Sequence, residues 1–421
     1  MLRLRRGLLV ARELPVRLLL WVWLPTRLLI WWRRLAQPTR RPPESAPKSI
    51  ILFRLDALGD VVLTTPLFRE LKRAFPGSRL TVVVQRAYAS ILETNPNIDE
   101  LLTLPVFSAR WLPAHTRRLF AAISLYRREL SGRHFDLAIT PRWDTDEHLA
   151  AFLCLLTNAR VRAGYSEAAS AGKKRYNRGF DGAFDLCLDP GPLQHEVERN
   201  LGFIAALGGR VREKHLEIDL LPKDHAQVRQ VLRDLSEECA VLALGIGAQT
   251  PGRRWRIEHY AAVIRELAMQ YPLYIVIVCA PSERPEARRL QTTLPVPAFI
   301  SDGPNIRETC VLLARCELFI GNDTGSAHLA AAMQCPTIVI SRHPGDGDPA
   351  HPNSPVRFAP WCDCSRVLQP EHGLDQCTER CLRDEPHCIE QVSVAEVALA
   401  AKTMLMQSQR AHDKLGMSCY S

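Results

Sequence analysis

The stretch FRLDALGDVVLTTPLFREL, Phe53–Leu71, leads from a buried strand through a sharp corner into a helix, and this passage decides the fold class. The run Ile50–Phe53 is continuously apolar, which is typical of a parallel strand covered on both faces. A helical pattern resumes over Val61–Phe75 and ends before a Pro-Gly pair. Because ligands of parallel α/β sheets bind at the carboxyl ends of the strands, we expect chemistry at the corner Ala57–Asp60.

The corner contains a glycine followed by an aspartate, Gly59 and Asp60. A glycine ahead of a helix lets a ligand approach the backbone closely. Asp60 has two interpretations. It caps the helix by accepting hydrogen bonds from the amides of Val62 or Leu63, or it is a general base that takes a proton from an incoming hydroxyl. The corner alone leaves both open.

Strand-like apolar runs and helical patterns alternate along the chain in two series. The strands are expected at Ile50–Phe53, Leu80–Val84, Leu101–Leu104 and Phe135–Thr140, and then at Ala240–Leu244, Leu273–Cys279, Leu318–Ile320 and Thr337–Ile340. The later helices are expected at Ile257–Gln270, Glu283–Leu294 and Gly325–Gln334. Residues 105–133 are too long for a usual crossover and predict an inserted helix. The alternation predicts two doubly wound α/β domains facing a cleft, residues 49–220 and 221–408, with a tail at 409–421.

The net charge of +9 belongs to one end of the chain. Residues 1–41 hold ten arginines and one acidic residue, which leaves 44 basic and 44 acidic side chains elsewhere of the 54 and 45 in total. The neutral globular part gives no support for a nucleic-acid partner. Residues 1–41 also hold four of the eight tryptophans, in a Trp/Leu-rich run that Pro25 and Arg27 interrupt.

Such a basic, Trp/Leu-rich segment indicates attachment to an anionic membrane surface, and residues 42–48 form a linker behind it. The run is short for a spanning helix, and no cleavage site of a signal peptide follows it. A deeper insertion, or a helix docked on the protein itself, stays open.

A second polar corner, FIGNDTGSAHLAAA at Phe319–Ala332, follows an apolar strand. The free amides at the start of the following helix make an anion site. Asp323, Thr324, Gly325 and His328 crowd this corner, with Thr324 and His328 four residues apart and expected on one side of the helix. The alternative is a capped helix with a surface histidine.

A third segment, GIGAQTPGRRW at Gly245–Trp255, begins with Gly-x-Gly after a strand but lacks the third glycine of a dinucleotide site. Arg253 and Arg254 are suited to clamp a phosphate. Glu283 follows the next strand and either binds ribose hydroxyls or stabilises a helix start by its charge.

Five of the thirteen cysteines gather near the end of the chain, namely Cys362, Cys364, Cys377, Cys381 and Cys388. Four thiolates can hold zinc or iron tetrahedrally, so a structural metal is one interpretation. Free thiols and disulfides are the alternatives.

Four sequence blocks together resemble glycosyltransferase family 9, the ADP-heptose:lipopolysaccharide heptosyltransferases. They are ILFRLDALGDVVLTTPLFRELKRAFPGSRLTVVV, HEVERNLGFIAALG, RRW followed by a helix, and GNDTGSAHLAAAMQCPTIVI. The resemblance covers about Lys48–Met404. It implies a GT-B fold of two Rossmann-like domains, with the acceptor on the N-terminal domain and the nucleotide sugar mainly on the C-terminal one.

The resemblance also implies roles for individual residues. Asp60 matches the family's catalytic base, with Gly59 and Asp56 on the acceptor side. The donor-binding residues it implies are Arg253, Arg254, Glu283, Asp323, Thr324, Gly325 and His328. The chain departs from the family where Arg253 replaces a lysine, and where Asp56 and Ala57 replace small hydroxyl residues.

The expected activity is inverting transfer of a heptose-like sugar from an ADP-sugar to a lipopolysaccharide-core or other glycan or lipid-linked hydroxyl. The expected place is the cytoplasmic face of a bacterial inner membrane. No catalytic cofactor is expected, because the helix start at Thr324 and the two arginines replace a divalent metal. The alternatives are a nucleotide-sugar epimerase or hydrolase and a non-catalytic nucleotide-sugar-binding assembly factor.

Overall fold

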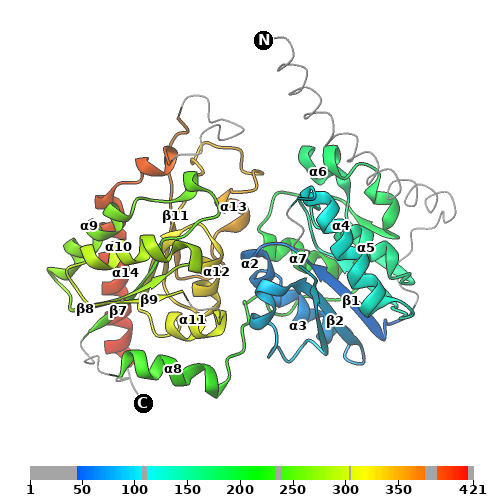
Figure 1. Cartoon of the computed structure of the whole chain (residues 1–421), viewed down its shortest axis with the longest axis horizontal. Coiled ribbons are helices and arrows are strands. Elements are labelled where there is room, and N and C mark those ends of the chain that lie inside the picture. Colours follow the sequence, from blue (N-terminus) through cyan, green and yellow to red (C-terminus); the bar gives the residue numbers. More distant parts are fainter. Residues whose placement is uncertain (1–44, 107–110, 234–238, 303–304, 375–385, 416–421) are drawn as a thin grey trace, which may run out of the picture.

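The computed structural model describes residues 45–106, 111–233, 239–302, 305–374 and 386–415. They form two α/β domains, each built on a six-stranded parallel sheet. Helices α2 (Leu58–Val62) and α12 (Gly325–Ala332) face each other where the domains meet (Figure 1). The predicted membrane-associated segment, residues 1–41, lies outside the described residues. Within the described part, no helix combines the length and apolar character needed to cross a membrane.

Both sheets have the same strand order. The first runs β3-β2-β1-β4-β5-β6 and the second β9-β8-β7-β10-β11-β12, so each places its first strand beside its second and fourth. The strands of the first sheet are β1 (Ser49–Arg54), β2 (Arg79–Gln85), β3 (Glu100–Leu104), β4 (Leu137–Thr140), β5 (Val161–Tyr165) and β6 (Leu186–Leu188). Those of the second are β7 (Ala240–Gly245), β8 (Leu273–Val278), β9 (Ala298–Ser301), β10 (Leu318–Asn322), β11 (Thr337–Ile340) and β12 (Ser365–Leu368). This Rossmann-type order puts a switch point next to β1 in one domain and next to β7 in the other.

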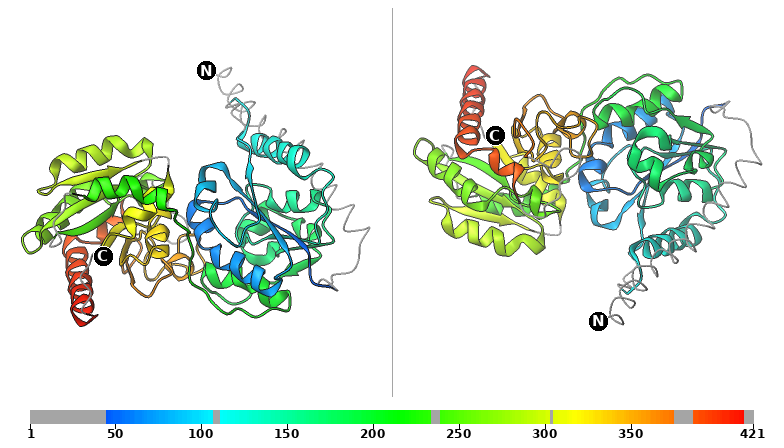
Figure 2. Two further views of the ribbon diagram at one scale, coloured as in Figure 1. Left: turned by 90° about the horizontal axis from the view of Figure 1, so that it is seen from below. Right: turned by 90° about the horizontal axis from the view of Figure 1, so that it is seen from above.

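Helices cover the faces of both sheets, and α14 lies on the part of the second domain that is remote from the first (Figure 2). The N-terminal domain carries α2, α3 (Thr65–Ala74), α4 (Ala114–Leu125), α5 (Ala150–Leu156), α6 (Ala171–Tyr176) and α7 (Glu196–Ala206). After these come α8 (Pro222–Leu232), α9 (Ile257–Ala268), α10 (Arg284–Thr293), α11 (Ile306–Leu313), α12, α13 (Pro355–Phe358) and α14 (Val394–Leu415). Short 3-10 turns include Arg86–Ile91, Pro251–Arg253 and Pro281–Glu283.

The central strands are buried on both faces, as their continuous apolar sequences predict. Ile50 and Leu52 of β1 belong to one hydrophobic cluster and Ile51 and Phe53 to another, on opposite sides of the sheet. The inserted helix expected within residues 105–133 is present as α4.

The helix after the opening corner differs from the prediction. It begins at Leu58 rather than Val61 and ends at Val62, and α3 then begins at Thr65 with a proline in its first turn. The early start draws Gly59 and Asp60 into the first helical turn, because Ala57 already has the extended backbone of a helix cap. The corner is therefore part of a helix and not a loop before one.

Candidate active site

The two predicted corners meet at the domain boundary. A Cβ atom on Gly59 would lie 2.5 Å from Cδ2 of His328, and one on Gly325 would lie 2.9 Å from the side chain of Leu58. Real Cβ atoms do not come so close to other atoms, so each glycine makes room for a side chain of the other domain. The contact places Asp60 and the start of α12 on facing sides of one junction.

Asp60 is held at both carboxylate oxygens. Its Oδ1 accepts hydrogen bonds from Nη2 of Arg54 at 3.0 Å and Nη1 of Arg142 at 3.4 Å. Its Oδ2 accepts from the amide of Ala57 at 3.2 Å. The predicted cap on the amides of Val62 or Leu63 is wrong, because Asp60 is the third residue of α2 and its side chain reaches back to the amide ahead of the helix. The side chain keeps 12% exposure.

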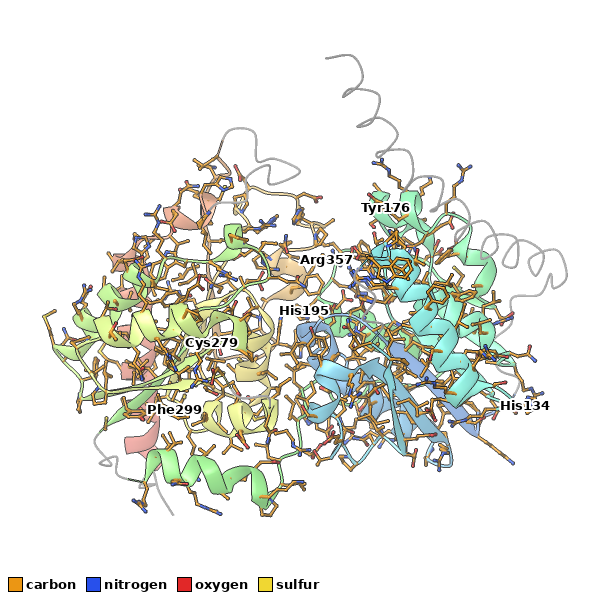
Figure 3. The ribbon with its side chains drawn as sticks, viewed as in Figure 1. His134, Tyr176, His195, Cys279, Phe299 and Arg357 are labelled. Carbon is orange, nitrogen blue, oxygen red and sulfur yellow. The ribbon has the colours of Figure 1, made fainter. Side chains whose placement is uncertain are left out.

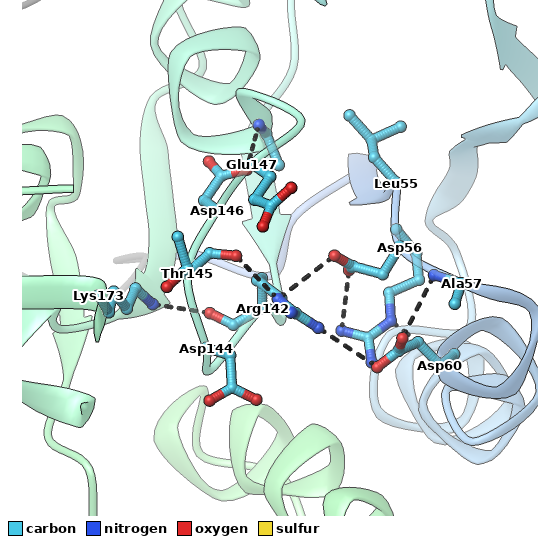
Figure 4. A network of polar contacts seen from close by, with 12 residues as sticks. Leu55, Asp56, Ala57, Asp60, Arg142, Asp144, Thr145, Asp146, Glu147 and Lys173 are labelled. Carbon is cyan, nitrogen blue, oxygen red and sulfur yellow. Dashed lines mark hydrogen bonds and ion pairs between the residues drawn. The ribbon is translucent and has the colours of Figure 1, made fainter. Parts of the chain in front are cut away.

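Asp56 shares the same two arginines. Nη1 of Arg54 lies 3.4 Å from its Oδ2, and Nε of Arg142 lies 3.3 Å from its Oδ1. We call Arg54, Asp56, Asp60 and Arg142 the corner cluster, and Figure 4 shows Arg142 in contact with both Asp56 and Asp60. Arg54 also lies 3.5 Å from the buried Glu196, outside the cluster. Burial alone raises the pKa of Asp56, but the charges of Arg142 and Arg54 outweigh it, and the pKa lies below its usual range.

Arg142 is positioned by the loop after β4. Its carbonyl accepts a hydrogen bond from Nζ of Lys173 at 2.7 Å, and its Nε donates to the carbonyl of Thr145 at 3.2 Å (Figure 4). Lys173 also donates to the carbonyl of Tyr165, and burial lowers the pKa of Lys173 to about 8. The hydrogen bonds of Lys173 and Thr145 thus hold the loop that carries Arg142 to the cluster.

Arg357 reaches from the C-terminal domain into the N-terminal one. Nη2 of Arg357 lies 2.6 Å from Oδ2 of Asp144, and its guanidinium lies over the ring of Trp143. Nε2 of His195 lies 2.9 Å from the carbonyl of Ala359, and burial lowers the pKa of His195 to about 4. Figure 3 shows Arg357 and His195 close to the domain boundary.

Sequence reasoning missed the roles of Arg142, Asp144 and Arg357. Arg142 lies 82 residues from Asp60 and Arg357 lies 213 residues from Asp144, so no local pattern marks either pair. His195 stood in one of the blocks that carried the family resemblance, which was the only signal for this region.

The donor-side corner is organised around Asp323. Nη2 of Arg253 donates to the carbonyl of Asp323 and lies 3.3 Å from its Oδ2. Thr324 is the residue before α12 and has extended backbone, and its hydroxyl lies 2.9 Å from that of Ser326. The helix start carries no side-chain cap from Thr324, so its first amides are not used by that hydroxyl.

His328 is buried, so the alternative of a surface histidine is wrong. Its ring packs on Gly59 of the other domain. Burial lowers the pKa of His328 although the charges of Asp323 and Asp60 act in the opposite direction. Its ring thus fills the space beside Gly59, and its buried Nδ1 has no hydrogen-bond partner among the described residues.

Glu283 lies beneath the loop that follows β7. Its Oε1 accepts hydrogen bonds from the Ala248 amide at 3.2 Å and from Arg254 at 3.3 Å, and its Oε2 accepts from the Ala280 amide at 2.9 Å. A Cβ atom on Gly247 would lie 2.1 Å from Glu283 Oε2, which explains the second glycine of the Gly-x-Gly pattern. Arg254 also pairs with Glu286, so the structure ties it to two carboxylates.

Asn322 holds the same loop from the other side and was missed in the sequence. Its fully buried amide donates to the carbonyls of Ile246 and Gly247. Its Oδ1 accepts from the amide of Trp255 and the hydroxyl of Tyr260. The signal for it was an asparagine at the end of an otherwise apolar strand, where a buried amide needs several partners.

Part of the predicted cysteine site lies outside the described residues, namely Cys377 and Cys381. Sγ atoms of Cys362 and Cys364 are 2.9 Å apart, and contact with Cys362 lowers the pKa of Cys364 to about 7. Cys388 is buried. Among the described residues, no group of three or more histidine, cysteine, aspartate or glutamate side chains is arranged to hold a metal ion. The five-cysteine metal site stays a prediction.

Comparison with known proteins gives a consistent family match. The sequence model of glycosyltransferase family 9 (heptosyltransferase) matches residues 123–361, which is more than half of the chain. The chain is 23% identical over 328 residues to the lipopolysaccharide core heptosyltransferase OpsX of Haemophilus influenzae, covering 77% of this chain and 84% of that protein. It is 25% identical over 376 residues to lipopolysaccharide heptosyltransferase 1 of Pseudomonas aeruginosa, covering 85% and 98%.

Solved structures match the fold of both domains. A family 9 glycosyltransferase from Veillonella parvula superposes with a TM-score of 0.65 at 20% identity, covering 86% of this chain and 97% of that one. The ADP-heptose lipopolysaccharide heptosyltransferase II of Escherichia coli superposes with a TM-score of 0.61 at 18% identity, covering 86% and 99%. The predicted architecture of two parallel-sheet α/β domains of the GT-B type is confirmed.

Proposed function

Because the chain belongs to glycosyltransferase family 9, the heptosyltransferases, and is therefore a glycosyltransferase, we propose that it moves a heptose-like sugar with inversion from an ADP-sugar to a lipopolysaccharide-core or other glycan or lipid-linked hydroxyl. One observation carries this proposal. The carboxylate of Asp60 and the start of α12 belong to corners that contact each other through Gly59 and His328. A base and an anion site on facing sides of one junction are what such a transfer needs.

Asp60 is the proposed base. Arg54 and Arg142 engage its Oδ1, while Oδ2 accepts one bond from the Ala57 amide and has a further lone pair. Oδ2 takes the proton of the acceptor hydroxyl as the acceptor oxygen bonds to the anomeric carbon. The bond from that carbon to the diphosphate oxygen breaks with its electron pair, and ADP leaves.

The donor side stabilises the leaving diphosphate. The first amides of α12, after Thr324 and Gly325, present the positive end of the helix to the phosphate oxygens, and Arg253 beside Asp323 adds a charge. The Asp323 carboxylate accepts hydrogen bonds from sugar hydroxyls. Glu283 is the proposed ribose ligand, through the lone pair of Oε2 that the Ala280 amide leaves free, because Oε1 already accepts from the Ala248 amide and Arg254. This arrangement takes the place of a divalent cation in the transfer step.

We also propose that the enzyme works at the cytoplasmic face of a bacterial inner membrane, attached through residues 1–41. The ten arginines and four tryptophans of that segment support this, because arginine binds anionic headgroups and tryptophan prefers the interface. Flotation of the full chain and of a variant lacking residues 1–41 with anionic vesicles tests the attachment. Equal flotation of the two proteins contradicts it.

A structural zinc or iron at the cysteine cluster is a separate proposal, supported by the five cysteines that gather between residues 362 and 388. Metal analysis of anaerobically purified protein tests it. Less than one equivalent of zinc and iron together contradicts it.

The activity is tested by incubating the purified protein and membranes with a panel of ADP- and UDP-sugars and identifying products by mass. We expect a product heavier by one heptose-like residue, formed only with an ADP-sugar and only with acceptor. A sugar product formed without acceptor indicates an epimerase or hydrolase instead. ADP binding without any turnover indicates an assembly factor.

A further inference from the structure

Asp56 stands where the heptosyltransferase pattern has a small hydroxyl residue, and the structure shows what the carboxylate does there. Its side chain is only 11% exposed and lies between Arg54 and Arg142. Both arginines also contact Asp60. The departure from the family pattern is thus a second carboxylate in contact with the same two cations as the proposed base.

The corner cluster has two positive and two negative side chains. Each arginine contacts both carboxylates, at separations between 3.0 and 3.4 Å. A carboxylate paired alone with one buried and one half-buried guanidinium group is held strongly in its charged form and accepts a proton poorly. A second carboxylate shares the two cations and weakens that hold.

The wider surroundings do not replace this balance. The charged and titratable groups that interact with the two carboxylates are Arg54 at the end of β1, Tyr88 in the turn Arg86–Ile91, Arg142, Asp146 and His148 after β4, Lys173 on α6, Glu196 on α7, and His328 from the C-terminal domain. Asp323 and Arg253 face His328, and Asp144 faces Arg142. Burial lowers the pKa of His148 and of His328. Of these groups, Arg54 and Arg142 are the cations in ion-pair contact with Asp60, and Glu196 is a further carboxylate 3.5 Å from Arg54.

We propose that Asp56 is a positioning residue for the transfer reaction, which shares Arg54 and Arg142 with Asp60 and so keeps Asp60 able to accept the acceptor proton. Arg142, from the loop after β4, contacts both Asp56 and Asp60, as Arg54 does. This inference rests on the proposed function of Asp60 as the base.

The arrangement also fits the state after proton transfer. Arg54 is fully buried, and a buried cation needs negative charge beside it, which Glu196 at 3.5 Å supplies only from outside the cluster. When Asp60 becomes neutral, Asp56 remains beside both arginines. The negative charge needed to hold them is then still present within the cluster.

The test uses the full-length variants Asp56→Asn, Arg142→Gln and the double variant, with kcat measured against pH at saturating ADP-sugar. Asp56→Asn leaves Asp60 as the one carboxylate of the corner cluster beside both arginines, with Glu196 still 3.5 Å from Arg54, so we expect roughly a tenfold lower kcat and an acid limb moved to lower pH. Arg142→Gln removes one cation, so we expect the acid limb to move to higher pH. In the double variant the two changes cancel, and its acid limb and kcat lie closer to wild type than those of Asp56→Asn.

Asp185→Asn is the matched control. Asp185 forms a 2.6 Å ion pair with Arg162 in the same domain, and neither residue contacts the corner cluster. We expect its melting temperature to fall while the pH limb of its kcat stays in place. Thermal unfolding of every variant is recorded, and Asp56→Ser replaces Asp56→Asn if the asparagine variant does not fold.

Three outcomes overturn the inference. They are an unchanged kcat and pH profile in the Asp56 variant, acid limbs that move in the same direction in both single variants, and losses in the double variant equal to the product of the single losses. Asp60→Asn is measured in the same assay. If that variant keeps wild-type kcat, the proposed base itself is wrong, which separates that failure from failure of the Asp56 inference.

Discussion

The two domains share one strand order, but the carboxyl ends of their sheets are built differently. At the N-terminal sheet, charged side chains contact one another, as in the corner cluster of Arg54, Asp56, Asp60 and Arg142. At the C-terminal sheet, the fully buried Asn322 bonds the backbone of Ile246 and Gly247, and the ion pair Arg253–Asp323 lies at the following corner. The same strand order thus carries a cluster of ion pairs in one domain and a backbone-bonded asparagine in the other.

The two ends therefore differ in what their polar side chains do: one set pairs charges, and the other holds the backbone of a loop. The carboxyl end of the N-terminal sheet surrounds Asp60 with charged side chains, whereas that of the C-terminal sheet fixes a loop and leaves the start of α12 without a side-chain cap. Substitutions at the carboxyl end of the N-terminal sheet are therefore expected to change kcat and its pH dependence. Substitutions at the carboxyl end of the C-terminal sheet are expected to change donor binding.

The largest effect is expected at Asp60. Asp60→Asn removes the proposed base with little change in shape, and we expect kcat to fall by roughly a thousandfold. ADP binding, measured by calorimetry, stays within about twofold because the donor side is intact. Loss of ADP binding together with transfer would contradict the assignment of donor binding to the C-terminal sheet alone.

The next largest effect is expected at the contact between Gly59 and His328, which joins the two domains. Gly59→Ala places a Cβ atom 2.5 Å from Cδ2 of His328, so the two corners move apart. A misplacement of about 1 Å in an active site costs roughly a hundredfold in rate, and we expect a loss of that order in kcat. His328→Ala in the same chain relieves the clash, and a double variant no more active than Gly59→Ala contradicts this explanation.

A smaller effect, on binding and stability, is expected at Asn322. Asn322→Ala leaves the carbonyl of Ile246 and the amide of Trp255 without the partner they have now. We expect the C-terminal domain to lose about 2 kcal/mol in its free energy of unfolding and KM for the ADP-sugar to rise, with little change in kcat. Denaturant unfolding and steady-state kinetics measure the two, and a fall in kcat at constant KM is the contrary result.

The smallest effect concerns pH and the contact of His195 with the carbonyl of Ala359. The folded chain keeps His195 neutral down to a pKa of about 4, while the unfolded chain binds the proton near pH 6.5. Stability is therefore full above pH 6.5 and is lost as pH falls toward 4, by about 1 kcal/mol between pH 7 and 5.5. His195→Gln keeps a donor for Ala359, so its stability should depend less on pH over this range, as measured by chemical unfolding.

The sequence was most informative where one local rule decided the structure. The buried central strands and the corners at Gly59 and Asp323 were predicted, because apolar runs and turn residues act over a few positions. Strands β5, β6, β9 and β12 were missed. They are short and flank the central strands, and two of them carry an arginine, Arg162 and Arg366, that interrupts the apolar run.

The ionic partners were beyond the reach of local patterns. Asp56 was named as an acceptor-side residue, yet Arg142, which contacts it, comes from another strand end. Likewise, the Arg253 and Arg254 pair was predicted as one phosphate clamp, but Arg254 is held by Glu283 and Glu286 while Arg253 contacts Asp323. Neighbours in the chain take different partners because successive side chains point in different directions.

The paired glycines at the domain boundary bear on how such enzymes can be recombined. Gly59 fits His328 of the other domain, and Gly325 fits Leu58. A chimaera that joins the N-terminal half of this chain to the C-terminal half of a relative will inherit only one side of each fit. Domain exchange among these proteins therefore requires the two complementary pairs to be transplanted together, even when each half folds well by itself.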